Sequence, residues 1–314
     1  MTNNSLTVRG TRMKLYAFGL GLALILCTSV WAQRESADTF RVSEPITYTF
    51  QTVNYPNDTF TQLLGINNSS EIAGYHGSGA AGSPNQGFTL VLPNGFTTEN
   101  YPESAQTQVI GINNSGTTDG FYIDTAGVTH GFIDYNNTFS TVTFDHTTFN
   151  QLLGVNNLYQ TVGYWQNPSG TDFAYIWAQD GGVFLSYTIP NATSAQATGI
   201  NDKGESCGFY IDSNMVSHGF TLNTGTLTVL NYPGATATSA SGVNNNGYVV
   251  GFYVDSAGLT HGFIYAKGTF HSVDDPNGVG ATIINGINAS GQIVGFYGSC
   301  VTGGTTCNGF VGTP

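Results

Sequence analysis

The sequence predicts an all-β fold, a six-bladed β-propeller with four antiparallel strands in each blade. The N-terminal strand is expected to complete the last blade and so close the ring. Three observations support this prediction: a motif that recurs six times, turn signals that divide each repeat into four segments, and chain ends that complement each other. Composition agrees, because 42 of the 314 residues are glycine, and Thr, Val, Ile, Tyr and Phe dominate beyond the N-terminal region.

One motif recurs along the chain as Gly-Ile/Val-Asn, a polar turn, and then glycine with one or two aromatic residues. It begins at Gly65, Gly111, Gly154, Gly199, Gly242 and Gly286, with spacings of 46, 43, 45, 43 and 44 residues. A repeat of about 44 residues has room for four short strands and their turns, which is the size of a propeller blade.

Turn signals separate four strands within each repeat. The first strand ends at Gly-Ile/Val-Asn and turns through stretches such as "NNSG" and "NDKG". The second, typified by "VGFY", turns through "DTAG", "NPSG" or "DSAG", with Asp or Asn first and Gly fourth as in type I turns. The third begins at "HGF" and closes through "PNG", "NTG" or "AKG", and the fourth ends near a proline in most repeats.

The two ends of the repeat region predict how the ring closes. The last repeat stops at Pro314, after its third strand, whereas "ITYTFQTVNYP" (46–56) has the pattern of a fourth strand with no first three before it. Pairing of these segments would remove the open edges of a sheet. The propeller domain is therefore predicted to span 46–314, preceded by a lead-in linker at 33–45.

Residues 1–32 have the pattern of a signal peptide. Arg9, Arg12 and Lys14 precede an apolar run that ends at the small residue Ala32, so cleavage is expected before Gln33. The protein is then secreted, extracellular or periplasmic, with no stable membrane insertion after cleavage. A retained membrane anchor is the alternative, disfavoured because the run is at the short limit for a spanning helix. The sequence leaves open whether translation starts at Met1 or Met13.

Charge excludes one class of partner. All 19 acidic residues follow Ala32, but only Arg34, Arg41, Lys203 and Lys267 remain basic there, so the mature chain would carry a net charge of −15. A protein that binds nucleic acid needs a basic face to neutralise phosphates. Nucleic acid is therefore not expected as a partner.

The cysteines that follow the leader predict one disulfide. Cys300 and Cys307 flank "VTGGTT", a loop that a bond between them would close, as is common in exported proteins. The sequence does not say whether this pair is oxidised. Cys207 occupies the position of Val162, Val250 and Val294 in other repeats, which predicts a small buried side chain.

Reiterated "GINNSG…VGFY…HGF" units in an exported protein resemble the bacterial HAF-repeat family of probable extracellular proteins, which is named for a His-Ala-Phe triplet. The triplet here is His-Gly-Phe, beginning at His130, His218 and His261. The resemblance covers about Gly65 to Pro314. It implies an exported repeat protein and assigns no catalytic residue.

An Asp–His pair recurs in "YIDTAGVTHGF", "YIDSNMVSHGF" and "YVDSAGLTHGF", and its residues are Asp124 and His130, Asp212 and His218, and Asp255 and His261. Each Asp is predicted to accept backbone hydrogen bonds in a type I turn, and each His to pair with a tyrosine across the hairpin. A calcium ring and ligand contact by the histidines are the alternatives. No metal or cofactor is expected, since dense alternation of Asp and Asn is absent and equivalent residues of different blades lie far apart.

Known catalytic patterns are missing from the sequence. It contains no "GxSxG" elbow and no "HExxH", and the partial similarity of "DSAGLTHGF" to the sialidase Asp-box lacks the arginine cluster that such an enzyme needs. No catalytic residue is predicted. The leading hypothesis is a monomeric binding or surface-interaction module for a glycan or protein, and the alternative is a polysaccharide hydrolase or lyase that uses loop carboxylates.

The loops that join the fourth strand of one repeat to the first strand of the next are the predicted place for a ligand. We call them interblade loops. Aromatic residues there, with Asn and Thr neighbours, suit sugars or peptides, whereas the acidic residues are read first as a solvated rim that keeps the protein soluble. The candidate ligand-binding residues are Tyr55, Tyr101, Asp145, His146, Phe149, Tyr232, Asp274 and Asp275.

Overall fold

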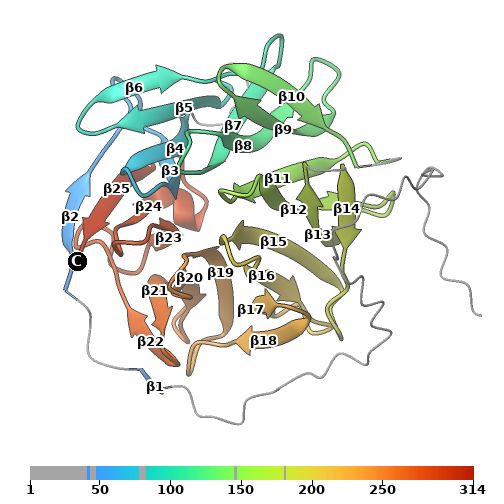
Figure 1. The fold of residues 1–314 in the computed structure, drawn as a ribbon. Coiled ribbons are helices and arrows are strands. Elements are labelled where there is room, and N and C mark those ends of the chain that lie inside the picture. Colours follow the sequence, from blue (N-terminus) through green and yellow to red (C-terminus); the bar gives the residue numbers. More distant parts are fainter. Residues whose placement is uncertain (1–40, 43–46, 78–82, 145–146, 180–181) are drawn as a thin grey trace, which may run out of the picture. The chain divides into compact units, whose positions relative to one another are not determined.

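A computed structural model describes residues 41–42, 47–77, 83–144, 147–179 and 182–314. Within these ranges the chain consists of short strands and one 3-10 turn, Ser299–Thr302. The strands form six sheets arranged around a central axis (Figure 1). The predicted six-bladed propeller, with four antiparallel strands per blade, is confirmed.

The six blades follow one another along the chain. Blade 1 contains β3 (Thr61–Ile66), β4 (Glu71–His76), β5 (Gln86–Val91) and β6 (Gly95–Thr98); blade 2 contains β7 (Gln106–Ile112), β8 (Thr118–Ile123), β9 (Thr129–Tyr135) and β10 (Thr138–Val142). Blade 3 contains β11 (Asn150–Val155), β12 (Gln160–Gln166), β13 (Asp172–Ala178) and β14 (Val183–Ser186); blade 4 contains β15 (Ser194–Ile200), β16 (Ser206–Ile211), β17 (Ser217–Asn223) and β18 (Thr226–Leu230). Blade 5 contains β19 (Ala237–Val243), β20 (Val249–Val254), β21 (Thr260–Ala266) and β22 (Thr269–Ser272); blade 6 contains β23 (Thr282–Ile287), β24 (Ile293–Tyr297), β25 (Asn308–Thr313) and β2 (Thr49–Thr52).

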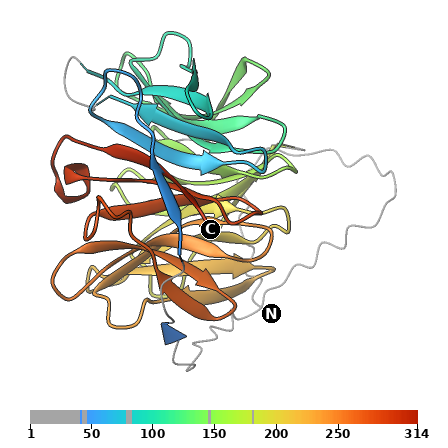
Figure 2. The same cartoon turned by 90° about the vertical axis from the view of Figure 1, so that its left-hand side faces the viewer.

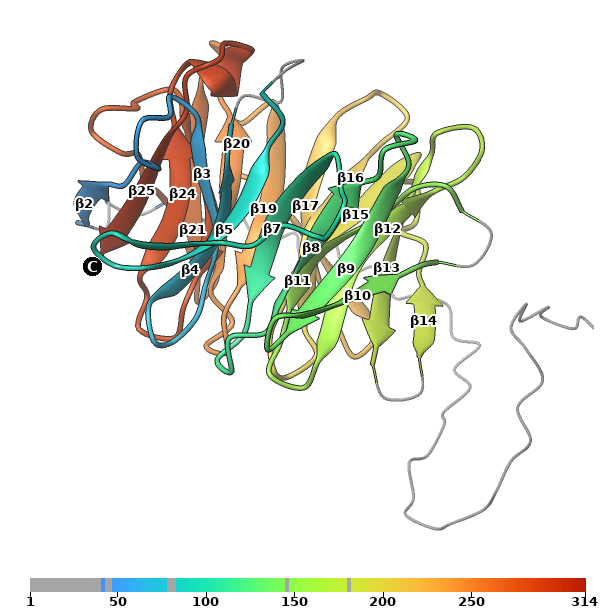
Figure 3. The same ribbon diagram turned by 90° about the horizontal axis from the view of Figure 1, so that it is seen from above.

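The N-terminal strand closes the ring as predicted. β2 pairs antiparallel with β25, from Thr49 opposite Thr313 to Thr52 opposite Phe310. Blade 6 therefore has its fourth strand, and the blue start and red end of the propeller lie side by side (Figures 2 and 3). Of the predicted lead-in at 33–45, the structure describes β1 (Arg41–Val42), which pairs in parallel with β22 at the outer edge of blade 5.

Buried aromatic side chains fill the spaces between blades. The phenylalanine of the "HGF" position, or its equivalent, is fully buried in every blade; these residues are Phe88, Phe132, Tyr175, Phe220, Phe263 and Phe310. Burying one such side chain contributes about 1.5–3 kcal/mol to folding. The same buried aromatic position therefore contributes to the core of all six blades.

The glycine of the recurring motif lies where the innermost strands of neighbouring blades approach each other. A Cβ atom added to Gly111 would lie 2.9 Å from the Cα atom of Gly154, and one added to Gly199 would lie 3.0 Å from that of Gly242. Real Cβ atoms do not tolerate such approaches to backbone. The motif glycine is therefore required by the narrowness of the ring and not by a turn.

The asparagine that follows joins all six blades in a closed circle of hydrogen bonds. Each side-chain amide donates to the backbone carbonyl of the equivalent asparagine in the next blade, over 2.9–3.2 Å. The members of this asparagine ring are Asn67, Asn113, Asn156, Asn201, Asn244 and Asn288. Each Oδ1 atom also accepts two backbone N–H groups of its own turn, as Asn113 does from Ser115 and Thr117. The first motif asparagine thus stabilises both a turn and the ring.

The Asn113→Ala variant is expected to lower the free energy of unfolding by about 2–3 kcal/mol, since it leaves buried backbone groups without partners. Asn114→Ala is the matched control, because that exposed side chain accepts one hydrogen bond, from the Asn68 amide. Its cost should be about 1 kcal/mol or less. Urea denaturation measures both values, and equal costs would contradict the role of the asparagine ring.

Cys300 and Cys307 are joined by a disulfide with Cα atoms 5.4 Å apart, and Cys207 is fully buried with a free thiol. Burial raises the pKa of the Cys207 thiol to about 12.

Within the described ranges, no helix is long and apolar enough to cross a membrane. The predicted signal peptide, 1–32, lies outside the described residues.

Candidate functional site

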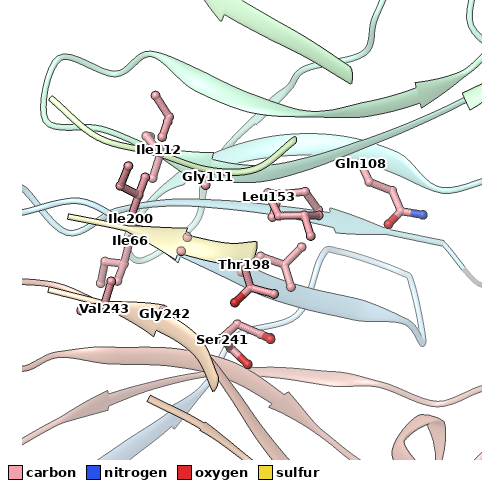
Figure 4. A pocket seen from close by; sticks show the side chains of 18 of the residues that line it. Ile66, Gln108, Gly111, Ile112, Leu153, Thr198, Ile200, Ser241, Gly242 and Val243 are labelled. Carbon is pink, nitrogen blue, oxygen red and sulfur yellow. The ribbon is translucent and has the colours of Figure 1, made fainter. Parts of the chain in front are cut away.

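A central cavity of about 380 Å³ is lined by the innermost strands of all six blades (Figure 4). Gln62, Gln108 and Gln151 line it near the starts of their strands, which follow the interblade loops. The cavity therefore opens toward the interblade loops, the face on which the sequence predicted a ligand.

A β-bulge in every innermost strand supplies the wall of this cavity. The register with the second strand shifts just before the motif glycine in all six blades. An extra residue at such a position leaves the ladder, and its side chain is turned in a new direction. The six extra residues all line the cavity: Leu64, Ile110, Leu153, Thr198, Ser241 and Asn285.

The bulge residues divide the cavity into two unlike halves. Those of blades 1 to 3 are aliphatic, whereas those of blades 4 to 6 carry a hydroxyl or an amide. Two of the polar ones hold neighbouring blades together, because Thr198 donates to the Ala240 carbonyl at 3.0 Å and Asn285 donates to the Leu63 carbonyl at 3.2 Å. Ser241 lies between them, and no described residue forms a hydrogen bond with its hydroxyl. Its side chain is available to a ligand.

A ring of aliphatic side chains forms the floor of the cavity. These side chains also line a smaller hollow beside the asparagine ring, so they separate the two spaces. Each is only 6–8% exposed; they are Ile66, Ile112, Val155, Ile200, Val243 and Ile287. The motif position that is always isoleucine or valine is thereby explained by packing around one axis.

The lining of the cavity is uncharged. Among the described residues that line it, Tyr75 is the one with a titratable side chain, and burial raises the pKa of its phenol. The hydroxyl of Tyr75 donates to Oε1 of Gln62 at 2.5 Å, which fixes the amide at the mouth. Such a surface offers amides, hydroxyls and aliphatic groups, but no carboxylate or imidazole for acid–base chemistry.

Three of the predicted ligand-binding aromatics are held in stacks between blades. Tyr55 stacks on His76 with ring centroids 3.5 Å apart, Tyr101 on Tyr122 at 3.7 Å, and Tyr232 on Tyr253 at 3.6 Å. In each pair the first ring belongs to an interblade loop and the second to the blade that follows. Tyr232 is 8% exposed. These rings pack the interblade loops onto the blade that follows, which the sequence reasoning did not anticipate.

The predicted acidic candidates also have partners within the fold. Oδ2 of Asp274 lies 2.6 Å from Nδ1 of His261, and Asp275 is fully buried with Oδ1 accepting the Asn277 amide at 2.8 Å. Burial raises the pKa of Asp275. Phe149 packs 5.6 Å from Tyr164, and Asp145 and His146 lie outside the described residues.

The Asp residues of the hairpin turns accept backbone hydrogen bonds of the predicted kind. Oδ1 of Asp124 accepts the amides of Ala126 and Val128, both at 2.9 Å, and the bond from Val128 holds the pKa of this carboxyl below its usual range. Asp212 and Asp255 have the same arrangement.

The histidines of the repeat pair with tyrosines across the hairpins, as expected from the turn length. Tyr122 lies opposite His130, with equivalent pairs in blades 4 and 5 and ring centroids 5.0–5.2 Å apart. The structure adds a direct contact, because each Nε2 atom lies 3.1–3.4 Å from the carboxylate of its own turn Asp.

Sequence reasoning missed a set of buried acids in blades 1 and 2. Asp119 is fully buried at a position that is Val162 in blade 3; its Oδ1 atom accepts the Gly111 amide at 2.9 Å, and Oδ2 has no partner. Burial raises the pKa of Asp119 to about 8 and that of Glu99 to about 7, and it also raises the pKa of Asp134. Alignment of the six repeats contained the signal, since each acid replaces an apolar residue found in most of the other blades.

Comparisons with known proteins support the architecture. No family model matches this sequence, and no curated protein matches it. Three solved structures have a similar fold. TolB from Acinetobacter baumannii matches 68% of this chain with a TM-score of 0.53 and 12% identity. A mutant Aleuria aurantia lectin in complex with Fucα1-6GlcNAc matches 82% of this chain with a TM-score of 0.51 and 11% identity, and SapL1 lectin in complex with alpha methyl fucoside matches 76% with a TM-score of 0.50 and 10% identity. The match covers 54% of the TolB chain, 97% of the Aleuria lectin and 88% of SapL1. At these identities the likeness establishes the fold alone.

Proposed function

We propose that this protein is an exported, non-enzymatic binding module that takes an uncharged, hydroxyl-bearing ligand, such as the end of a neutral glycan, into the central cavity. The observation that carries the proposal is the uncharged lining, divided between an aliphatic wall and a wall of hydroxyls and amides. A sugar has the same division, since its ring presents C–H groups on one side and hydroxyls at its edges.

The size of the cavity is consistent with this class of ligand. Its volume of about 380 Å³ falls in the range of small-molecule sites. Two lectins of similar fold are in complex with a fucosylated sugar and a methyl fucoside, which adds support for the class but not for a particular sugar.

The alternative, a polysaccharide hydrolase or lyase, needs a pair of available carboxyl groups at a cleft. Of the candidates in the described loops, Asp275 is fully buried and Asp274 contacts His261. Neither lines the central cavity. The described residues therefore favour binding over turnover.

Replacing Ser241 by leucine, the residue that blade 3 carries at its bulge, is expected to weaken binding at least about tenfold, since it removes the free hydroxyl and fills the polar half. Residues 33–314 would be screened on an array of neutral glycans, and the affinity for the best one measured by calorimetry. Ser256→Leu, the same change on an exposed turn of blade 5, is the control and should bind like the parent.

Equal affinity of the Ser241→Leu and parent proteins would contradict the cavity as the site. Release of reducing ends or unsaturated products from any bound polysaccharide would instead favour the enzymatic alternative.

A further inference from the structure

A second pocket, about 280 Å³ in volume, lies at the junction of blades 4 and 5, outside the central cavity. We call it the junction pocket. One wall is Val216, Ser217 and His218, at the start of β17, and the other is the interblade loop and strand start at 231–238. The two pockets share no lining residue.

The interblade loop that forms one wall of the pocket has small side chains. Gly234, Ala235 and Ala237 occupy positions that blade 1 fills with Asn57, Asp58 and Phe60. In blade 1 the Phe60 ring packs 6.1 Å from Tyr75, and blade 3 has Phe149 at the same position, 5.6 Å from Tyr164. Position 237 is alanine, as position 281 is in blade 6, so no large side chain extends from this strand start.

Some junctions between blades carry an isolated backbone bridge, and others, this one among them, show none in the described residues. Isolated parallel bridges join Phe60 to Cys307, Thr129 to Phe149 and Thr260 to Ala281. The equivalent pair here is Ser217 and Ala237, and no bridge joins them in the described part of the chain. Ser217 instead reaches across with its side chain, which donates to the Thr238 carbonyl at 3.2 Å. A side-chain hydrogen bond therefore links the two blades at a place where no backbone bridge is found in the described residues.

A polar group with unused hydrogen-bonding capacity lies in the pocket. The His218 ring is fixed from both sides, with Nε2 at 3.3 Å from Asp212 and Nδ1 at 2.9 Å from Oδ1 of Asn231. The ring contacts one polar atom of the Asn231 side-chain amide. The second polar atom of that amide has no partner among the described residues. Whichever way the amide is oriented, one polar atom of an exposed, positioned side chain remains for a ligand.

The residue next in sequence to the pocket residue Val216 is an exposed apolar side chain in a strained conformation. Met215, which precedes Val216, is 80% exposed and has a φ angle of 63°. The other hairpin turns of this type have Gly127, Gly170 or Gly258 at this position, with φ angles of 78–85°. A methionine there costs stability relative to glycine, and such costs are found at ligand-binding positions.

We infer that the junction pocket is a second binding site, specific for a single neutral sugar ring. Val216, Pro233 and Ala235 provide an apolar surface for the C–H face of the ring, and the Asn231 amide is placed for its hydroxyls. Asp212 behind His218 disfavours acidic sugars by charge repulsion. The site is independent of the central cavity and does not rest on the function proposed for it.

The test titrates residues 33–314 with the methyl glycosides of glucose, galactose, mannose, fucose and xylose, and with methyl glucuronide as the acidic probe, by calorimetry and saturation-transfer NMR. At least one neutral glycoside is expected to bind, and the glucuronide to bind at least about tenfold more weakly. Ala237→Phe, which reproduces the side chain of blades 1 and 3, should abolish binding to this pocket. Ser241→Leu, which alters the central cavity, should leave it unchanged.

Met215→Gly separates a binding role from a structural one. Because it relieves the strained φ angle, the variant is expected to melt at a higher temperature than the parent while binding the glycoside more weakly. The inference is overturned if no neutral glycoside binds, if binding survives both Ala237→Phe and Met215→Gly, or if Ser241→Leu alone abolishes it. That last result would support the central cavity instead.

Discussion

Deletion of residues 46–56 is expected to prevent the propeller from closing and to cost more than about 5 kcal/mol, enough to unfold many domains. The deletion removes all of β2, and with it the antiparallel pairing to β25. It also removes buried Val53 and the Tyr55 ring that stacks on His76. Blade 6 would keep three strands, and the exposed edge of β25 would be free to pair with other molecules.

The measurement is a thermal melt with size-exclusion chromatography of the deletion variant, beside a control that begins at residue 46. The control loses β1, whose two residues pair with β22 at the outer edge of blade 5. Its melting temperature should fall by no more than about 3 °C. A soluble monomer that lacks 46–56 and melts with the parent would show that the ring does not depend on this strand.

The second large effect is a loss of stability with rising pH that depends on Asp119. Its folded-state pKa of about 8 lies above the value of about 3.9 expected in an unfolded chain. Between these two values the folded state binds more protons, so the free energy of unfolding falls as pH rises from about 4 to about 8 and changes little above that range. Glu99 adds a loss in the same direction that ends near its pKa of about 7.

Asp119→Asn is expected to match the parent near pH 4 and to melt about 5–10 °C higher at pH 9, since the amide keeps the shape of the protonated acid without its charge. The matched control is Asp212→Asn, which removes an exposed turn carboxyl whose pKa is lowered first by the Val216 amide. Because a lowered pKa makes the charged form the stabilising one, this control should not gain stability at high pH.

Melting curves from pH 4 to pH 9 measure both variants. Parallel curves for Asp119→Asn and the parent would contradict a buried acid that must ionise in the folded state. A gain by Asp119→Asn at pH 9 that is absent from the control would locate the effect at the blade 2 core.

Much of the architecture could be predicted because local signals agree with one another. Asp124 and Gly127 specify a type I turn through their own backbone bonds and φ angle, so the hairpin could be assigned from a few residues. The incomplete last repeat and the extra strand at 46–56 then required the ring to close. Stacking of His130 beside Tyr122 followed from the same turn length.

The binding surfaces could not be predicted in the same way. Tyr232 was a reasonable ligand platform as a residue in a loop, but in the ring it meets Tyr253 of the next blade. Leu153, Thr198 and Ser241 lie outside the recurring motif, and bulges at these positions turn them into the cavity. A bulge depends on how two strands pair, which short-range patterns do not specify.

The sequence by itself determined the number of blades, the strand order, the turns and the strand that closes the ring, because each follows from residues close together or from a count of repeats. Tertiary structure alone decided which side chains face the axis, that the motif asparagine links all six blades, and that small residues line a pocket beside His218. The physical reason is that these properties arise between blades, where residues about 44 positions apart in the chain come into contact only after the ring has formed.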